Sequence, residues 1–185
     1  MPYAIRRATS ADVPALAALA EATFIDTFGP DGFDVGYPEA DLSHFLAESY
    51  APERVAMWLA EPTSQVLLAE DGAGRLAAYA HSGANTLPYD KAGPDDGELK
   101  RIYLRRDTQG TGLGRALLER ALDWLGDRPV LIGVWSENLK AQRFYAHYGF
   151  ERVAGYSFMV GQTADAEFIL RRERPLPLIP AQPGP

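Results

Sequence analysis

One glycine-rich segment has the residue types and spacing to bind a phosphate group: Gln109-Gly110-Thr111-Gly112-Leu113-Gly114-Arg115. Glycines let the backbone approach a ligand closely and adopt positive φ angles. A predicted helix follows this segment, and the free N–H groups at a helix start favour an anion. The segment therefore indicates a phosphate site, although a tight turn without any ligand would use the same residues.

Two familiar nucleotide-binding patterns do not fit this segment. The P-loop pattern G-x-x-x-x-G-K-[ST] is absent, because no lysine follows the last glycine. The dinucleotide pattern G-x-G-x-x-G fails as well, because Arg115 or Leu117 stands where its last glycine belongs. The pattern that does fit is Q-x-x-G-x-G, formed by Gln109, Gly112 and Gly114.

A second pattern follows the predicted strand at residues 129–135. It has the form N-x-x-A-x-x-F-Y-x-x-x-G-F and consists of Asn138, Ala141, Phe144, Tyr145, Gly149 and Phe150. In this order and spacing, the two patterns resemble the GNAT superfamily of acetyl-CoA-dependent N-acetyltransferases, and the resemblance covers residues 3–172. Segments 24–28, 99–104 and 133–138 are similar to the bacterial spermidine/spermine N-acetyltransferase branch.

The resemblance implies a fold and a co-substrate. The fold is the α/β GNAT fold, a single mixed, mostly antiparallel sheet of about seven strands flanked by helices, with a cofactor cleft where strands four and five splay apart. The co-substrate is acetyl-CoA, the acetyl donor. The family positions that would bind it are Ile102, Tyr103, Leu104, Gln109, Gly110, Thr111, Gly112, Leu113, Gly114, Arg115, Asn138 and Ala141. The backbone at residues 102–104 would include the donor to the developing negative oxygen.

The resemblance also assigns the two proton-transfer roles to Glu98 and Tyr145. A primary amine with a pKa of about 10.4 must lose a proton before it attacks. Glu98 resembles the strand-four glutamate that serves as base in the histone acetyltransferase branch. Tyr145 lies seven residues after Asn138, on the same helix face, and matches the family's proton donor to the leaving thiolate. Simpler explanations stay open: a solvent-facing Glu98, a core Tyr145 and a helix-capping Asn138.

Hydrophobic patterning predicts the elements that must hold these residues. Strands are expected over residues 3–8, 65–70, 75–82, 98–104, 129–135, 150–158 and 165–172. Helices are expected over residues 11–28, 39–50, 53–60, from the glycine turn to about 125, and 137–148. One acetyltransferase domain would span residues 1–172, followed by a proline-rich, loose tail over 173–185.

Composition excludes several function classes. The chain has 185 residues, no cysteine and a formal net charge of −7. Without cysteine there is no disulfide, thiolate zinc site or cysteine nucleophile, so acetyl transfer would be direct. The three histidines share no metal-ligand spacing, so no metal is expected. Net acidity argues against partners such as nucleic acid or a membrane surface, and no apolar run is long enough to span a bilayer. A cytoplasmic protein is predicted, and a homodimer stays open.

The charge is unevenly distributed along the chain. Residues 29–62 carry seven acids against one arginine, and residues 85–98 carry four acids against one lysine, so their net charges are −6 and −3. Residues 99–120, around the glycine turn, have a net charge of +4. In the GNAT superfamily the segment after the first helix and the loop before strand four usually wall the acceptor site. Both are acidic in this chain, so they would attract a polycation. The alternative is a solvated acidic face that only aids solubility.

These observations predict an N-acetyltransferase that moves acetyl from acetyl-CoA to a primary amine of a small cationic acceptor, with polyamines such as spermidine or spermine first. Acetylation of a peptide, a protein or an aminoglycoside is the alternative within the same class of enzyme. A non-catalytic acyl-CoA-binding or sensing module is the alternative from another class, although the presence of both Glu98 and Tyr145 argues against it.

Overall fold

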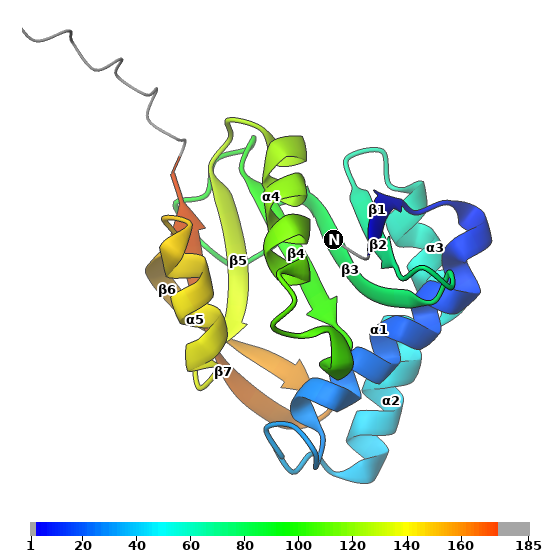
Figure 1. Cartoon of the computed structure of the whole chain (residues 1–185). Helices are drawn as coiled ribbons and strands as arrows, with labels where there is room; N and C mark the ends of the chain where they lie inside the picture. Colours follow the sequence, from blue (N-terminus) through cyan, green and yellow to red (C-terminus); the bar gives the residue numbers. More distant parts are fainter. Residues whose placement is uncertain (1–2, 174–185) are drawn as a thin grey trace, which may run out of the picture.

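Seven strands pair in the order β1-β2-β3-β4-β5-β7-β6 in a computed structural model that describes residues 3–173 (Figure 1). Their bounds are Ala4–Arg7 (β1), Gln65–Glu70 (β2), Leu76–Ala84 (β3), Gly97–Leu104 (β4), Val130–Trp135 (β5), Glu151–Val160 (β6) and Thr163–Arg172 (β7). All neighbouring strands are antiparallel except β4 and β5. The predicted α/β fold with one mixed, mostly antiparallel sheet is therefore confirmed.

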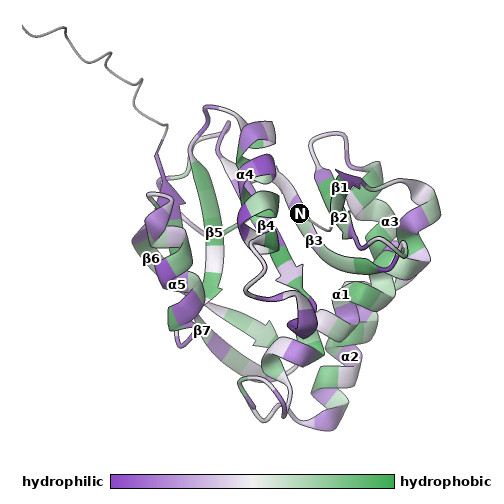
Figure 2. Cartoon of the chain, in the orientation of Figure 1, coloured by the Kyte–Doolittle hydropathy of each residue, from purple (hydrophilic) through white to green (hydrophobic). Residues whose placement is uncertain are grey.

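Two apolar clusters cover the two faces of this sheet. Helices α1 (Val13–Phe28), α2 (Glu39–Tyr50) and α3 (Pro52–Ala60) pack on one face, and α4 (Leu113–Leu125) and α5 (Leu139–His147) pack on the other. Helix α4 buries leucines and an alanine at helical spacing, so hydrophilic and hydrophobic patches follow each other along its ribbon in Figure 2, whereas β5 is mostly hydrophobic. This burial on both faces fixes the sheet that carries the cleft.

The pairing of β4 with β5 is confined to one end of these strands. Only Gly97 with Val130 and Glu98 with Leu131 are in register, and beyond them the two strands diverge. The closed end is held by a hydrogen bond from the Gly97 N–H to the Pro129 carbonyl (2.9 Å) and by a buried ion pair of Asp96 with Arg171 (3.3 Å). The predicted splay between the fourth and fifth strands is thus present.

A β-bulge at Lys100 changes the direction of the side chains along β4. On β3, His81 pairs with Arg101 and Ser82 pairs with Leu99, so Lys100 is left without a partner. Because an extra residue shifts the alternation of a strand, Glu98 and Arg101 both face the side covered by α1–α3.

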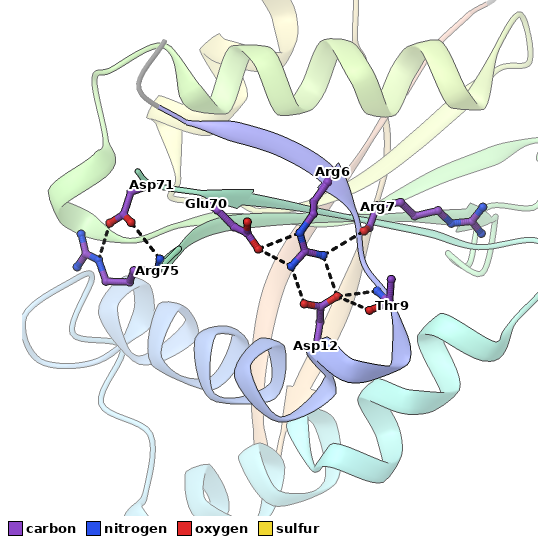
Figure 3. A network of polar contacts seen from close by, with 7 residues as sticks. All are labelled: Arg6, Arg7, Thr9, Asp12, Glu70, Asp71 and Arg75. Carbon is purple, nitrogen blue, oxygen red and sulfur yellow. Dashed lines mark hydrogen bonds and ion pairs between the residues drawn. The ribbon is translucent and has the colours of Figure 1, made fainter. Parts of the chain in front are cut away.

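A polar network fixes β1 against its neighbours (Figure 3). The Arg6 guanidinium donates to Glu70 on β2 and to both carboxylate oxygens of Asp12, at 2.8 and 2.6 Å. The Asp12 carboxylate also accepts hydrogen bonds from the Thr9 N–H (2.7 Å) and hydroxyl (2.8 Å). The network therefore couples an edge strand to the start of α1.

Short 3₁₀ turns precede α1 at Ser10–Asp12 and α4 at Arg106–Thr108.

Most predicted boundaries agree with the structure to within one or two residues, and α2 has the predicted bounds. The predicted proline-rich tail lies, from residue 174 onward, outside the described residues. None of the helices described over residues 3–173 is both long enough and apolar enough to cross a membrane.

Candidate active site

The cleft between β4 and β5 exposes backbone groups of β4. Ile102, Tyr103 and Leu104 pair with β3 on one side, and on the other side no β5 residue is in register with them. Backbone N–H and C=O groups on that edge are therefore available to a ligand. The structure places these three predicted positions along the cleft.

The glycine turn lies at the wide end of the cleft and leads into α4. Gly110 and Gly112 have φ angles of +78° and +84°, which side-chain-bearing residues rarely adopt, and Gly112 is the N-cap of α4. Thr111 stabilises the turn through a hydrogen bond from its hydroxyl to the Thr108 carbonyl (2.7 Å). The N–H groups of the first helical turn, at residues 113–115, have no intrahelical acceptor. The turn thus presents the anion-binding geometry that its sequence predicts.

Two polar contacts surround this turn. Lys140, at the start of α5, donates to the Gln109 side-chain oxygen (3.1 Å) and so connects α5 to the loop before α4. Arg115 is exposed and pairs with Glu119 one helical turn later (2.8 Å). Lys140 thus places a cation next to Gln109, and Arg115 carries another on the first turn of α4, three residues after Gly112.

Asn138 and Tyr145 occupy opposite ends of α5. Asn138 is the N-cap, and its side-chain oxygen accepts a hydrogen bond from the Ala141 N–H (3.0 Å). The capping role that stayed open for Asn138 is therefore present, and its amide nitrogen is the part left for a ligand. Tyr145 is 5% exposed, and burial raises the pKa of its phenol, so the phenol stays protonated.

A cavity of about 320 Å³ lies between the splayed strands on the face covered by α1–α3. Side chains of β4, the single residue Gly133 of β5, and side chains of β6 and β7 line it, together with residues from the α1–α2 region and from the loop before β4. The volume is that of a small-molecule site, and its lining joins both strands of the cleft.

Glu98 lies in this cavity and is only 6% exposed. One carboxylate oxygen, Oε2, accepts hydrogen bonds from the Thr86 N–H (2.7 Å) and hydroxyl (2.8 Å) and pairs with Lys100 Nζ (2.8 Å). Within residues 3–173, no donor is found for the other oxygen, Oε1. A solvent-facing role for Glu98 is thus wrong, and Oε1 is the atom left for substrate or water.

Two further acids, which the sequence interpretation missed, come from β7. Asp165 accepts a hydrogen bond from the Tyr37 hydroxyl, and Glu167 accepts one from the Tyr156 hydroxyl. Burial raises the pKa of the Glu167 carboxyl, and the bond from Tyr156 opposes this shift only in part. Gly133 makes room for the second pair, because a Cβ there would lie 2.5 Å from the Tyr156 hydroxyl and 2.8 Å from Glu167 Oε2.

The two acidic segments line the cavity as predicted, but most of their acidic side chains do not face it. Tyr37 and Tyr50 line it from residues 29–62, and none of the seven acids of that segment does. From residues 85–98, Glu98 lines the cavity, whereas Asp96 pairs with Arg171 elsewhere. The cavity acids thus come mainly from β7. Their spacing of two residues on one strand was the available signal, since such residues share a face.

The sequence matches the family model described as "Acetyltransferase (GNAT) family" over residues 32–150. The chain belongs to the GNAT acetyltransferase family. An N-acetyltransferase of unspecified substrate from Lactobacillus delbrueckii subsp. lactis is 31% identical over 166 residues, covering 87% of this chain and 91% of the relative. A Mycobacterium bovis N-acetyltransferase, also of unspecified substrate, is 30% identical over 166 residues, covering 88% and 97%.

Solved structures share the same GNAT fold. The PaiA N-acetyltransferase of Thermoplasma acidophilum, in complex with coenzyme A, superposes with a TM-score of 0.72 at 18% identity, covering 94% of this chain and 99% of that one. A GNAT acetyltransferase from Streptococcus pneumoniae superposes with a TM-score of 0.64 at 20% identity, covering 92% and 98%.

The described residues fit acetyl-CoA. The β4 edge that does not pair with β5 suits the peptide-like arm of the co-substrate. The positive-φ glycines at the start of α4 suit its pyrophosphate, because the space next to Gly110 and Gly112 is open: a Cβ at either position would meet no atom within 4 Å. Within residues 3–173, no group of three or more His, Cys, Asp or Glu side chains is arranged to hold a metal ion.

Proposed function

We propose that this GNAT acetyltransferase transfers acetyl directly from acetyl-CoA to a primary amine of a small cationic acceptor in the 320 Å³ cavity. The observation that carries the proposal is the set of three carboxylates, Glu98, Asp165 and Glu167, in a cavity that joins both strands of the cleft. An ammonium group is attracted into such a site before it is deprotonated. Polyamines such as spermidine and spermine are the acceptors that the sequence resemblance favours.

Glu98 is proposed as the base. Thr86 and Lys100 hold its Oε2, so its Oε1 is positioned to take the proton of the ammonium group, directly or through one water. Removing that proton near neutral pH costs roughly 4–5 kcal/mol for an alkylamine, so a positioned acceptor contributes directly to the rate. The free amine then forms the new C–N bond.

Bound acetyl-CoA supplies an activated acetyl group whose C–S bond breaks as the amide forms. Backbone N–H groups of β4, at residues 102–104, are proposed to stabilise the negative charge that develops on the carbonyl oxygen. Tyr145 is proposed to donate its phenolic proton to the departing sulfur. The protons balance, because the ammonium group loses two: the first goes to Glu98 before the attack, and the second goes to solvent as the amide forms. Tyr145 gives one proton to the sulfur and regains one from solvent, and Glu98 releases its proton to solvent, so each turnover releases one proton.

The test measures thiol release from acetyl-CoA over a panel of amines: spermidine, spermine, short diamines, amino acids, a short peptide and an aminoglycoside. Small amines should be acetylated with the highest kcat/KM, because a cavity of about 320 Å³ matches their size. Preference for the peptide or the aminoglycoside would support the alternative acceptors. Coenzyme A binding without turnover of any amine would instead support a non-catalytic acyl-CoA-binding module.

A further inference from the structure

Arg101 is a cation in the cavity that the proposed chemistry does not use. The bulge at Lys100 turns its side chain to the cavity side of β4, opposite His81 of β3. Its guanidinium carbon lies 4.6 Å from the centre of the Trp58 ring and 5.9 Å from that of Tyr50. The guanidinium is therefore held in place by stacking, with one side facing the cavity.

No negative charge neutralises this guanidinium within residues 3–173. Of the cavity carboxylates, Glu98 pairs with Lys100, and Asp165 and Glu167 accept hydrogen bonds from tyrosines. None of the three forms an ion pair with Arg101. A guanidinium that is largely removed from water and lacks a counter-ion is destabilising for the fold, so its position calls for a functional explanation.

Three titratable side chains close to Arg101, those of His81, Tyr50 and Tyr79, are neutral. Burial, helped by the nearby charges of Arg101 and Lys100, lowers the pKa of His81 to about 3, so the imidazole is uncharged at neutral pH. Burial also raises the pKa of the Tyr50 and Tyr79 phenols, so both stay protonated. A polycation would therefore meet repulsion at this end of the cavity.

We propose that the acceptor carries a carboxylate as well as its amine, and that Arg101 binds this carboxylate. The proposal rests on the proposed acetyl transfer to a primary amine, and it favours amino acids or other small amino carboxylates over polyamines as the acceptor. Arginine is suited to this role, because its planar donors bind a carboxylate in bidentate fashion. With the carboxylate on Arg101, the amine points to the end of the cavity that holds Glu98 and the acids of β7.

The experiment compares matched acceptors that differ only in the anionic group: an amino acid, its primary amide and the decarboxylated amine, with spermidine included. Charge-assisted hydrogen bonds contribute about 1.5–3 kcal/mol, so the wild-type kcat/KM should be at least about tenfold higher for the carboxylate. The advantage should appear mainly in the KM for the acceptor. The KM for acetyl-CoA should not depend on the acceptor chosen.

Variants separate binding from a structural role. Arg101→Met should remove the preference for the carboxylate, and Arg101→Lys should retain part of it, with the KM for acetyl-CoA unchanged in both. Arg152→Met is the matched control, because Arg152 also stacks on a ring, that of Phe168, but lies outside the cavity. If Arg101→Met fails to fold, inhibition of the wild-type enzyme replaces it. A simple aliphatic carboxylate should then compete with the acceptor, whereas the primary amide of that carboxylate should not.

Three results would overturn the inference. Equal kcat/KM for the amino acid and its amide would do so, as would a preference for spermidine that Arg101→Met leaves unchanged. In both cases turnover is present and the proposed acetyl transfer stands. Absence of turnover with every amine would remove the proposed function and the inference together.

Discussion

Two tyrosines near the end of α5, Tyr145 inside the helix and Tyr148 at its C-cap, have different surroundings. The Tyr148 hydroxyl donates to Glu119 on α4 (3.2 Å), so it already has a protein partner. Tyr145 is packed between Phe144 and Phe150, with ring centres at 5.4 and 5.8 Å. Burial raises the pKa of the Tyr145 phenol, so it keeps the proton that a leaving thiolate requires. The two positions therefore give a matched test of the proposed acid.

Tyr145→Phe should lower kcat by about 10²-fold, because a positioned general acid contributes on that order. The affinity for acetyl-CoA should change little, since the aromatic ring is kept. Steady-state kinetics and a direct binding measurement check both quantities. Tyr148→Phe is the control and should leave kcat unchanged. An unaltered kcat in Tyr145→Phe would remove the residue as the acid.

Two carboxylates of the cavity could take the amine proton, and their pH dependence separates them. Glu98→Gln should shift the pH–rate profile to alkaline values, because the reaction then depends on amine that has already lost its proton in solution. Glu48→Gln, exposed on α2 and outside the cavity, is the control. Burial raises the pKa of Glu167, which makes it the second candidate. An unmoved profile in Glu98→Gln together with a shifted one in Glu167→Gln would reassign the base to Glu167.

At the scale of the elements, one carboxylate joins β1, the start of α1 and, through Arg6, β2. The hydrogen bonds from Arg6, followed by those from Thr9, hold the pKa of Asp12 well below its usual range. Asp12→Asn should therefore lower the free energy of unfolding near neutral pH by about 1–2 kcal/mol. This figure already allows for the partial exposure of Arg6, which weakens the ion pair. Chemical denaturation measures this difference.

The same residue gives a pH dependence with a defined sign. Because the pKa of Asp12 is lower in the folded state, its contribution is fully present above the unfolded value of about 4 and is lost as the pH falls below it. The gap in stability between wild type and Asp12→Asn should shrink from about pH 5 toward pH 2. Glu21→Gln, exposed on α1, is the control. A gap that stays constant over this range would contradict the assignment.

Local signals in the sequence determine most elements but not the way they are combined. Helix α2 has the predicted bounds because Pro38 and Pro52 flank an unbroken helical segment, and the β2–β3 turn follows from Asp71-Gly72-Ala73-Gly74. The bulge at Lys100 has no such local signal, because it depends on the register with β3. For the same reason Arg101 was not recognised as a cavity residue.

In the candidate site, too, features set by local sequence were predicted and features set by long-range packing were not. The glycine turn is local and was predicted, and Gly110 and Gly112 have the positive φ angles that it requires. The Tyr37–Asp165 contact joins residues 128 positions apart and depends on the packing of the α1–α2 region against β7. A segment-wise count of charge included Glu98 but missed the two cavity acids of β7, because charge alone does not say which side chains face inward.

At the scale of the whole molecule, the sheet consists of two parts with little pairing between them. Strands β1–β4 and strands β5, β7 and β6 are joined by only two residue pairs, Gly97 with Val130 and Glu98 with Leu131. The buried ion pair of Asp96 with Arg171 adds to this junction. A ligand in the cleft would contact both parts at once, so its binding should stabilise the fold as a whole.

Acetyl-CoA at about 100 times its Kd should raise the stability by about 2.7 kcal/mol. In a chain of this size that corresponds to a rise of roughly 5–10 °C in Tm. Gly112→Ala should reduce this rise, because alanine at a positive φ strains the turn that presents the N–H groups of α4. Gly74→Ala, at a φ of +79° in the β2–β3 turn, imposes similar strain away from the cleft. Both variants should therefore lower the Tm of the free protein, but only Gly112→Ala should weaken the response to acetyl-CoA. An equal response in the two variants would mean that the glycine turn does not bind the pyrophosphate.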